Sequence, residues 1–324
     1  MRFTAPFRTL LCGFVCVFAT ALAQAQDSCP PHPPSPQDLH AGASRTDVRD
    51  RGFLWRLTRG GRTSWLYGTV HASRPDWVRP GPRVQAALAG SEVLALELDP
   101  SDPELMRAFS APADPARVAR VTAGLAPRIA ALAARECVSA TALAHLQPVL
   151  QVATLSLEDT RRDGFHPELA IDVMLWALAR GAGKDVVALE TPASQLAALL
   201  PESEAEEHAL LDESLREIET GEGRTTLRRL LQAWADNDTP QLASYAKWCQ
   251  CLDSPQERRY MERLNDERNG PIADKLAVLD ASGRPFFAAV GSLHMTGPQA
   301  LPRLLHERGF QVEPIALAAR STAR

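Results

Sequence analysis

The chain has 324 residues, of which 45% are hydrophobic and 23% are charged, so its composition is that of a globular protein and not of a disordered or collagen-like one. A formal net charge of −4 argues against a nucleic-acid-binding protein, which needs clustered positive charge, and gives no support for binding to an anionic membrane. The length allows one large domain or two small ones. Aromatic residues make up only 6% of the chain, so we expect a mostly aliphatic core.

The N-terminus has the pattern of a secretory signal peptide. Basic residues precede an apolar run from Thr9 to Leu22, and small residues then permit cleavage after Ala23 or Ala25. The alternative is a membrane anchor, but the run is shorter than the roughly 20 residues that a spanning helix needs. No later apolar run is long enough either. We therefore expect a signal peptide at residues 1–25, no integral membrane segment after its cleavage, and a secreted or periplasmic protein.

Four cysteines lie outside the signal peptide: Cys29, Cys137, Cys249 and Cys251. An even number in an oxidising compartment favours disulfides, and four cysteines allow three pairings. A Cys249–Cys251 bond would close a very small ring, so we expect each of these two residues to bond elsewhere, with Cys137 as a candidate partner. Buried free thiols are the alternative. A metal cluster has less support, because a single C-x-C motif lacks a second pair.

The first predicted elements follow a leader at residues 26–50 that is rich in Pro, Ser, His and Asp and that we expect to be disordered. Strands at 53–58 and 64–67, joined by a glycine-containing turn, predict a hairpin. A short helix is expected at 84–88. The apolar run at 93–98 predicts a buried strand, and its continuity indicates a central position in a sheet.

The middle of the chain, from residue 103 to about 279, is mainly helical in its periodicity. Helices are predicted at 117–135 and 169–179. The acidic stretch at 202–222 is interpreted as a helix with a solvated face. Between these helices a strand is predicted at 185–189, and a helix begins directly after it at Thr191-Pro192.

The end of the chain predicts a strand at 286–290, a helix at 298–308 and a strand at 310–315, which together form a βαβ unit. Both ends of the chain therefore supply strands to one mixed β-sheet, and a large helical region lies between them. The predicted fold class is α/β, with a single domain at residues 51–318 and a disordered tail at 319–324.

Two distant strands end in the same pattern, Gly68-Thr69-Val70-His71 and Gly291-Ser292-Leu293-His294. Glycine permits an unusual backbone dihedral angle at a strand exit and lets another group approach closely. Each histidine then lies beyond the carboxyl end of a strand, where ligand crevices form in open α/β sheets. The alternative is two structural histidines that are satisfied by hydrogen bonds.

Glu97 and Glu190 each end an apolar strand. A carboxylate flanked by leucines must find a partner or stay neutral, and near an imidazole it can orient the ring, share a metal ion or act as a general base. For Glu97 the alternative is a structural ion pair, with Arg268 as a candidate partner. For Glu190 the alternative is a contact with the N-terminus of the helix at Thr191-Pro192.

The motifs G-T-V-H, L-E-L-D, L-E-T-x-x-x-Q, E-R-N and V-G-S-L-H-M-x-G-x-x-x-L, in this order, resemble the TraB/GumN family. That family is similar to the Tiki proteases and, more distantly, to erythromycin esterases and the ChaN haem-binding proteins, and the resemblance implies an α/β fold of that kind. It places functional residues at His71, Glu97 and His294, with supporting roles at Arg268 and Asn269.

One position departs from the family pattern. Asp172 falls where the family usually has G-[IVL]-D, and here Ala170 replaces the glycine. The departure puts in doubt any contact that the family makes through the backbone at this glycine.

The resemblance implies first a divalent-metal-dependent, peptidase-like hydrolase. His71, Glu97 and His294 would hold Mn, Co or Zn with one position open for water, and Arg268 or Asn269 would stabilise the developing oxyanion. Since all three residues lie at strand exits, and the carboxyl ends of parallel strands share one edge of a sheet, we expect His71, Glu97 and His294 to converge within one cleft.

Two alternatives remain. In a metal-independent, esterase-like hydrolase, His71 would be the general base and Glu97 would orient it. In a non-enzymatic periplasmic protein, the same cleft would bind a peptide or haem. The chain contains no G-x-S-x-G, H-E-x-x-H or phosphate-loop motif, so the commoner hydrolase and nucleotide-binding classes are not expected. The expected partner is a peptide or small-molecule substrate, and no nucleic acid.

Overall fold

The computed structural model describes residues 29–35, 48–249 and 251–317 of the chain. The predicted signal peptide at 1–25 and the predicted tail at 319–324 lie outside the described residues. In the described part of the chain, no helix has both the length and the apolar character needed to cross a membrane.

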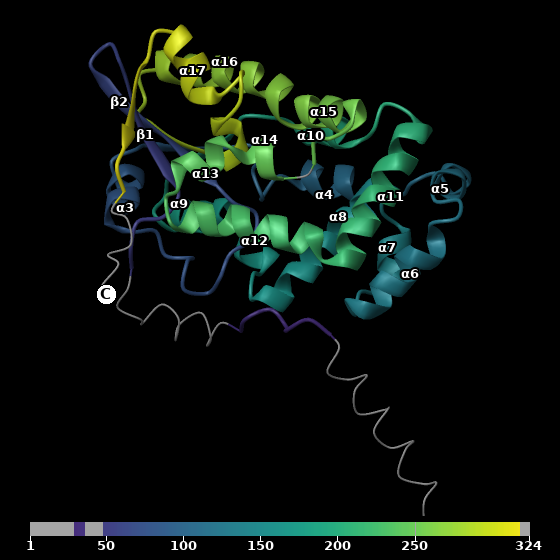
Figure 1. The fold of residues 1–324 in the computed structure, drawn as a ribbon. Coiled ribbons are helices and arrows are strands. Elements are labelled where there is room, and N and C mark those ends of the chain that lie inside the picture. Colours follow the sequence, from purple (N-terminus) through teal and green to yellow (C-terminus); the bar gives the residue numbers. More distant parts are fainter. Residues whose placement is uncertain (1–28, 36–47, 250, 318–324) are drawn as a thin grey trace, which may run out of the picture.

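Six strands form one mixed sheet in the order β4-β3-β5-β2-β1-β6. They are β1 (Phe53–Arg59), β2 (Arg62–Thr69), β3 (Val93–Leu96), β4 (Asp185–Ala188), β5 (Phe286–Gly291) and β6 (Gln311–Ile315). The four strands β4, β3, β5 and β2 run parallel, whereas β1 is antiparallel to both of its neighbours. The predicted α/β class, with a mixed sheet built from both ends of the chain, is confirmed (Figure 1).

The predicted hairpin is formed by β1 and β2. Gly60 and Gly61 lie between the paired residues Arg59 and Arg62, and both glycines have positive φ, +56° and +77°. A two-residue turn with positive φ at both positions matches the twist of the flanking strands, and glycine adopts it without a steric penalty. The local sequence therefore fixes the register of the hairpin.

The helices connect and cover these strands. They are α3 (Pro82–Ala89), α4 (Pro103–Phe109), α5 (Pro115–Val121), α6 (Ala126–Arg135), α7 (Ala140–Ala144), α8 (Pro148–Asp159), α9 (Ile171–Gly181), α10 (Pro192–Leu199), α11 (Glu204–Thr220), α12 (Glu222–Ala235), α13 (Thr239–Ala243), α14 (Tyr245–Trp248), α15 (Pro255–Met261), α16 (Glu267–Ala281) and α17 (Leu301–Glu307). A π-helical segment, η4 (Glu262–Asp266), joins α15 to α16, and the short 3-10 helix η5 (Ser292–Met295) follows β5.

The two faces of the sheet carry separate apolar cores because side chains alternate along each strand. Tyr67 and Phe287 pack on one face with α3, α9 and α12, whereas Leu66 and Phe286 pack on the other with α16 and α17. A third core joins α5, α6, α7, α8 and α11 and forms the helical region at the side of the sheet (Figure 1). This arrangement leaves the carboxyl ends of the parallel strands facing the helical region.

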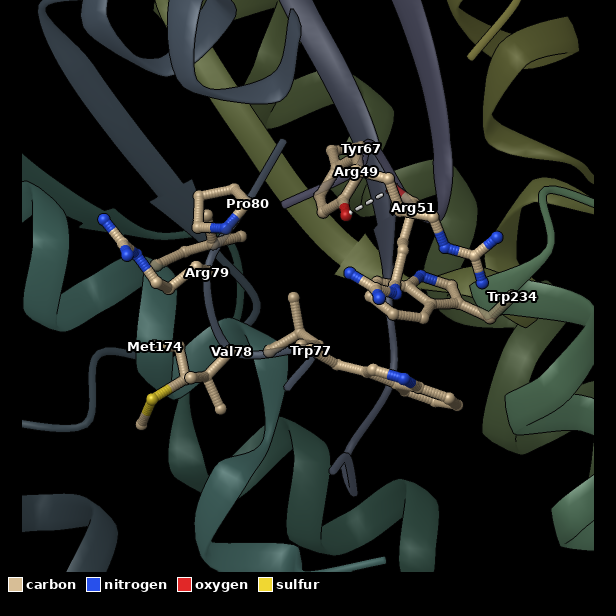
Figure 2. A pocket seen from close by; sticks show the side chains of 11 residues that line it. Arg49, Arg51, Tyr67, Trp77, Val78, Arg79, Pro80, Met174 and Trp234 are labelled. Atoms are coloured by element: carbon tan, nitrogen blue, oxygen red, sulfur yellow. Dashed lines mark hydrogen bonds between the residues drawn. The ribbon is translucent and has the colours of Figure 1, made fainter. Parts of the chain in front are cut away.

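A small pocket beside the first core lies next to Tyr67, Trp77 and Trp234 (Figure 2). The Tyr67 hydroxyl donates to the Arg51 carbonyl oxygen at 2.8 Å, and the Trp234 Nε1 donates to the Gly68 carbonyl oxygen at 2.7 Å. The cavity volume is about 10 Å³, which holds no more than a water molecule. The two hydrogen bonds connect Arg51, at the start of the domain, and Trp234 to β2. The pocket between these residues is too small to bind a substrate.

Two predicted helices differ from the structure. The predicted helix at 117–135 is divided into α5 and α6, because Gly124 between them has φ +77° and interrupts the helical geometry. The predicted acidic helix is α11, but its Glu207 is fully buried and forms an ion pair with Arg117. Its solvated face is therefore narrower than its composition indicated.

Every cysteine among the described residues is in a disulfide, as Cys29–Cys137 and Cys249–Cys251. The expectation of disulfides is confirmed, but the expected pairing of Cys137 with Cys249 or Cys251 is wrong. Cys249 is the C-cap of the short helix α14, and the Cys251 N–H donates to Cys249 Sγ at 3.2 Å. The two sulfurs, which ring size alone had argued against pairing, are bonded to each other.

Glu217 on α11 gives a pH-dependent prediction for stability. Burial, together with the nearby charges of Glu213, Glu257 and Glu222, raises the pKa of Glu217 to about 7. The folded chain therefore binds a proton that the unfolded chain has already lost, so this group costs stability as the pH rises from about 4.5 to about 7. Glu217→Gln should raise the unfolding free energy at pH 8 by about 1–3 kcal/mol.

Urea unfolding of the two proteins at pH 8 and at pH 4 measures this effect. The expected gain disappears at pH 4, where Glu217 is protonated in both states. An equal gain at both pH values would show that the substitution acts through packing and not through the charge of Glu217.

Candidate functional site

Three parallel strands deliver the predicted site residues to one edge of the sheet. β3, β5 and β2 are neighbours, and Glu97, His294 and His71 follow their carboxyl ends. A Cβ atom placed on Gly291 would lie 3.3 Å from Glu97 Oε1, 3.5 Å from His294 Cδ2 and 3.7 Å from His71 Nε2. The three side chains therefore surround a single point, although Gly291 is separated from Glu97 by 194 positions.

The two strand-exit glycines have different roles. Neither has a positive φ, so neither position uses the unusual dihedral angle that glycine permits. A Cβ on Gly68 would lie 2.9 Å from Ser292 Oγ, so this glycine allows η5 to pack against β2. Gly291 instead faces the functional side chains, and the absence of a side chain there leaves the centre of the site open.

Glu97 is held as a carboxylate by donors on both oxygens. Its Oε1 accepts from the Gly291 N–H at 2.7 Å, and its Oε2 accepts from Arg268 at 2.6 Å and from Gln195 at 3.0 Å. Burial by itself raises the pKa of Glu97, but the charges of the two histidines and of Arg268 outweigh this effect and lower the pKa to about 2. Glu97 is therefore an anion at every pH at which the protein would work.

Arg268 joins Glu97 to Glu190. Its Nε donates to Glu190 Oε1 at 2.9 Å, its Nη2 donates to both carboxylates, and its Nη1 donates to the Leu264 carbonyl oxygen at 2.8 Å. The ion pair between Glu97 and Arg268, which the sequence offered as the alternative for Glu97, is thus present. It does not exclude a functional role, because Glu97 Oε1 still faces the centre of the site.

Glu190 and Gln195 complete this arrangement. Thr191 caps α10 by accepting from the Ser194 N–H at 3.1 Å, and Glu190, which directly precedes this cap, accepts hydrogen bonds from Arg268 and Gln195. Gln195 lies on α10 and donates to both carboxylates. The motif L-E-T-x-x-x-Q contains both Glu190 and Gln195. Thr191 and Gln195 are four positions apart, which is about one helical turn, so this spacing could have indicated that Gln195 lies near Glu190.

His294 is fixed in one tautomer by Asn269. The Asn269 Nδ2 donates to the carbonyl oxygens of Gln299 at 2.8 Å and His294 at 3.4 Å, so its Oδ1 is the atom that faces His294 Nδ1, at 2.5 Å. His294 therefore carries its proton on Nδ1 and keeps a lone pair on Nε2. Burial is the largest influence on His294 and lowers its pKa to about 4, so the ring is neutral.

His71 is paired with Asp172. Its Nδ1 lies 3.5 Å from Asp172 Oδ1, and this negative charge is the largest of the influences that raise the pKa of His71 to about 9. The His71 side chain is 59% exposed, so it is the member of the candidate site that solvent reaches. Asp172 lies in the first turn of α9, and Ala170 before it has φ −51°, which suits any residue. Replacement of the family's glycine by Ala170 therefore strains no backbone.

A π-helical turn places Arg268 and Asn269 on two sides of the site. α15 continues through η4 into α16 without interruption, and Pro271 in α16 cannot donate a backbone hydrogen bond. π-bulges of this kind occur frequently at functional sites. Here Arg268 turns to the two carboxylates while Asn269, which is fully buried, turns to His294.

The side chains around Gly291 include the chemical types that bind divalent cations. Among the described residues, however, no group of three or more His, Cys, Asp or Glu side chains is placed so that it could hold a metal ion. His71 Nε2, Glu97 Oε1 and the Cδ2–Nε2 edge of His294 nevertheless face the same point, and each imidazole has its Nδ1 next to a side-chain oxygen. Metal-ligating histidines are usually held by a hydrogen bond from the other ring nitrogen to an oxygen, which His294 has with Asn269, whereas His71 forms an ion pair with Asp172 at 3.5 Å.

Comparison with other proteins supports one assignment. Neither a curated protein nor a solved structure shows a match to the chain. A profile of the TraB/PrgY/gumN family matches residues 53–314, which runs from the first strand to the last and includes every residue of the site described above. The chain therefore belongs to the TraB/PrgY/gumN family.

Proposed function

We propose that this chain is an exported, peptidase-like hydrolase whose site at His71, Glu97 and His294 holds a divalent metal ion, Mn, Co or Zn. The observation that carries the proposal is the convergence of two imidazoles and one carboxylate on the point in front of Gly291. Export is supported by the signal-peptide pattern and by two disulfides, which persist in oxidising compartments.

A bound divalent ion would supply Lewis-acid polarisation of a carbonyl oxygen and a more acidic water. The side chains have separate tasks around it. Glu97, an anion, and His294, a neutral imidazole with a free Nε2, are in the protonation states that ligands need. His71 is the exposed third candidate donor, and Asp172 lies on the Nδ1 side of its ring. Because the pKa of His71 is raised to about 9, a metal ion would have to displace the proton on its Nε2.

Arg268 and Asn269 act as positioning residues in this proposal. The guanidinium of Arg268 is engaged by Glu97, Glu190 and the Leu264 carbonyl, and the amide of Asn269 is engaged by His294 and Gln299. These contacts occupy most of the donors that the sequence prediction had assigned to an oxyanion. Their effect is to fix the carboxylate of Glu97 and the tautomer of His294 before substrate arrives.

A metal-independent hydrolase is the second candidate, and the pair of His71 and Asp172 favours it. Asp172 raises the pKa of His71 to about 9, so this exposed imidazolium is a suitable general acid, and it needs no metal to protonate the leaving group of an ester or a peptide. The two candidates predict different consequences of removing metal.

The distinguishing experiment begins with the full chain, purified without chelator or metal-binding tag and analysed for its metal content. The protein is then stripped with chelator and titrated with Mn²⁺, Co²⁺ or Zn²⁺ while heat release and unfolding temperature are recorded. The metal proposal expects binding near one equivalent, a higher unfolding temperature, and hydrolysis of a peptide library that returns with the metal. Hydrolysis that persists after stripping, with no binding of any of the three ions, would support the metal-independent candidate instead.

Gly291→Ala tests whether the open point in front of Gly291 is the reaction centre. Gly291 has φ −49°, which alanine adopts without strain, but the new methyl group would stand within 4 Å of His71, Glu97 and His294. We expect the variant to fold, to lose measurable metal binding, and to hydrolyse peptides at least about 100-fold more slowly, because small displacements of a site cost that much. Circular dichroism and the metal titration measure both effects.

Gly181→Ala is the matched control, because a Cβ at Gly181 meets nothing within 4 Å. It should leave both measurements unchanged. If Gly291→Ala retained full metal binding and hydrolysis, the reaction centre would have to lie elsewhere.

A further inference from the structure

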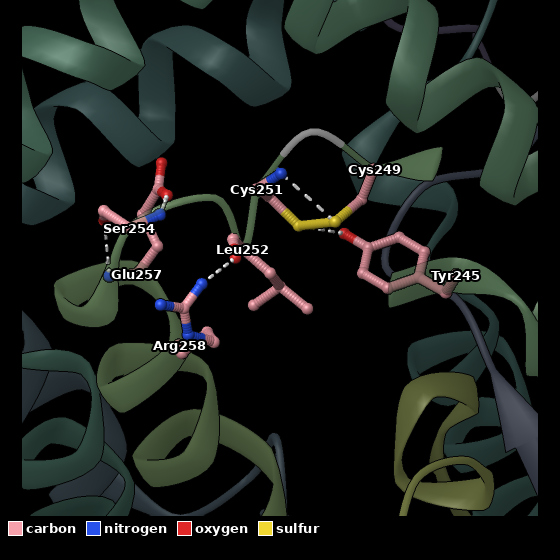
Figure 3. The surroundings of a disulfide bond; sticks show 7 residues. All are labelled: Tyr245, Cys249, Cys251, Leu252, Ser254, Glu257 and Arg258. Carbon is pink, nitrogen blue, oxygen red and sulfur yellow. Dashed lines mark hydrogen bonds between the residues drawn. A yellow bond between two sulfur atoms is a disulfide. The ribbon is translucent and has the colours of Figure 1, made fainter. Parts of the chain in front are cut away.

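The connection between α14 and α15 contains a disulfide that encloses a single residue (Figure 3). The other disulfide, Cys29–Cys137, spans 108 positions. In the chain-entropy account, a disulfide stabilises the fold by restricting the unfolded chain, and the restriction grows with the length of the enclosed loop. By the same account, a bond between Cys249 and Cys251 restricts the unfolded chain much less than the Cys29–Cys137 bond does, so it contributes the smaller share of the stabilisation.

The two sulfurs of this bond have different surroundings. Cys249 is buried, with 2% of its surface exposed, whereas Cys251 is partly exposed. The backbone N–H of Cys251 donates to Cys249 Sγ at 3.2 Å, and the hydroxyl of Tyr245 lies 3.6 Å from Cys251 Sγ (Figure 3). An N–H donor stabilises negative charge on the sulfur that accepts it. Cys251 is therefore the sulfur that an incoming thiolate reaches, and the charge that then develops on Cys249 Sγ has the Cys251 N–H as a donor.

From this asymmetry we propose that Cys249–Cys251 is a thiol–disulfide exchange site that accepts two electrons from a dithiol. One thiolate of the dithiol attacks Cys251 Sγ, the S–S bond breaks, and its electron pair leaves on Cys249 Sγ. The second thiolate then attacks its partner sulfur in the mixed disulfide and releases Cys251. The dithiol becomes a disulfide, and its two protons end on Cys249 and Cys251.

The position of the site in the fold connects it to the helix that carries Arg268 and Asn269. Cys251 is followed by the capping box of α15, in which Ser254 and Glu257 exchange hydrogen bonds, and α15 continues through η4 into α16. Opening the bond frees the connection just ahead of this helix. The exchange site does not depend on the proposed hydrolase function, and either can fail without the other.

The test uses the oxidised full chain and dithiothreitol as the dithiol, at a series of ratios to its own oxidised form and without denaturant. After acid quenching, free thiols are alkylated and each cysteine peptide is identified by mass, which separates Cys249 and Cys251 from every other cysteine. We expect Cys249 and Cys251 to become alkylated together while the near-ultraviolet circular dichroism stays native. Alkylation of this pair only after the native signal is lost would overturn the proposal, as would a pair that stays oxidised at every ratio.

Two single variants test the assignment of the attacked sulfur. Cys249→Ser leaves the partly exposed Cys251 thiol, and Cys251→Ser leaves the buried Cys249 thiol. In a background with Cys29→Ser and Cys137→Ser, a thiol reagent should modify Cys251 about tenfold faster than Cys249, because reactivity follows access. Equal rates in two folded variants would contradict the assignment of Cys251 as the attacked sulfur.

Discussion

Replacing His294 by alanine should abolish divalent-metal binding and hydrolysis together. The residue supplies the neutral Nε2 of the proposed site, and Asn269 holds its tautomer. Loss of a group that only orients a ligand already weakens metal binding 10–100-fold, so loss of the ligand itself should weaken it by at least about 100-fold. Calorimetric titration with Mn²⁺, Co²⁺ or Zn²⁺ measures the binding, and release of product from a peptide library measures the hydrolysis.

His306→Ala is the matched control, because this histidine lies exposed on α17 and belongs to neither core nor site. It should change neither the binding nor the hydrolysis. If His294→Ala removed hydrolysis from a protein that never bound metal, the metal-independent candidate would be supported. Unchanged hydrolysis in a folded His294→Ala protein would exclude both catalytic proposals.

Replacing Arg268 by methionine should produce the largest loss of stability in this region. Methionine keeps much of the length of the side chain but removes the charge that lies between Glu97 and Glu190. Both carboxylates are largely buried, with 12% and 7% of their side chains exposed, and both would lose the guanidinium that they share. Breaking a buried ion pair on one side typically costs about 3–5 kcal/mol, and we expect the unfolding free energy in urea to fall by that amount.

A second substitution shows whether the cost comes from the two carboxylates. Adding Glu190→Gln to Arg268→Met removes one of the uncompensated charges, so it should restore part of the stability without restoring hydrolysis. Arg303→Met is the matched control, because the pair of Arg303 and Glu307 is exposed on α17 and should contribute less than about 1 kcal/mol. Equal losses from Arg268→Met and Arg303→Met would show that the cluster around Arg268 is not a buried network.

The break within the predicted helix at 117–135 shows which features of the fold local sequence patterns predict and which they miss. Period-2 and period-3.6 patterns located the strands and most helices, because each depends on residues a few positions apart. The break at Gly124 was missed, since a single glycine is tolerated in many helices and its φ of +77° is set by the packing of α5 and α6.

The sequence by itself determined the edge of the sheet at which the site lies. Gly68 and Gly291 mark strand exits, His71 and His294 follow at the same spacing, and Glu97 ends a strand, so adjacency of the parallel strands was enough to bring the three side chains together. This inference needs only the rule that carboxyl ends of parallel strands share one edge.

Only the tertiary structure showed which hydrogen-bond and ion-pair partners each of these side chains has. Arg268 reaches Glu97 across 171 positions, Gln195 reaches it across 98, and the pairing of Cys29 with Cys137 depends on where α6 ends relative to the start of the chain. Such contacts depend on how each helix is rotated and shifted along its axis against its neighbours. The local sequence pattern shows which face of a helix is buried, but it does not show which distant residue that face meets. The residue types of the site were therefore readable from the sequence, whereas their protonation states, tautomers and ion pairs follow from packing.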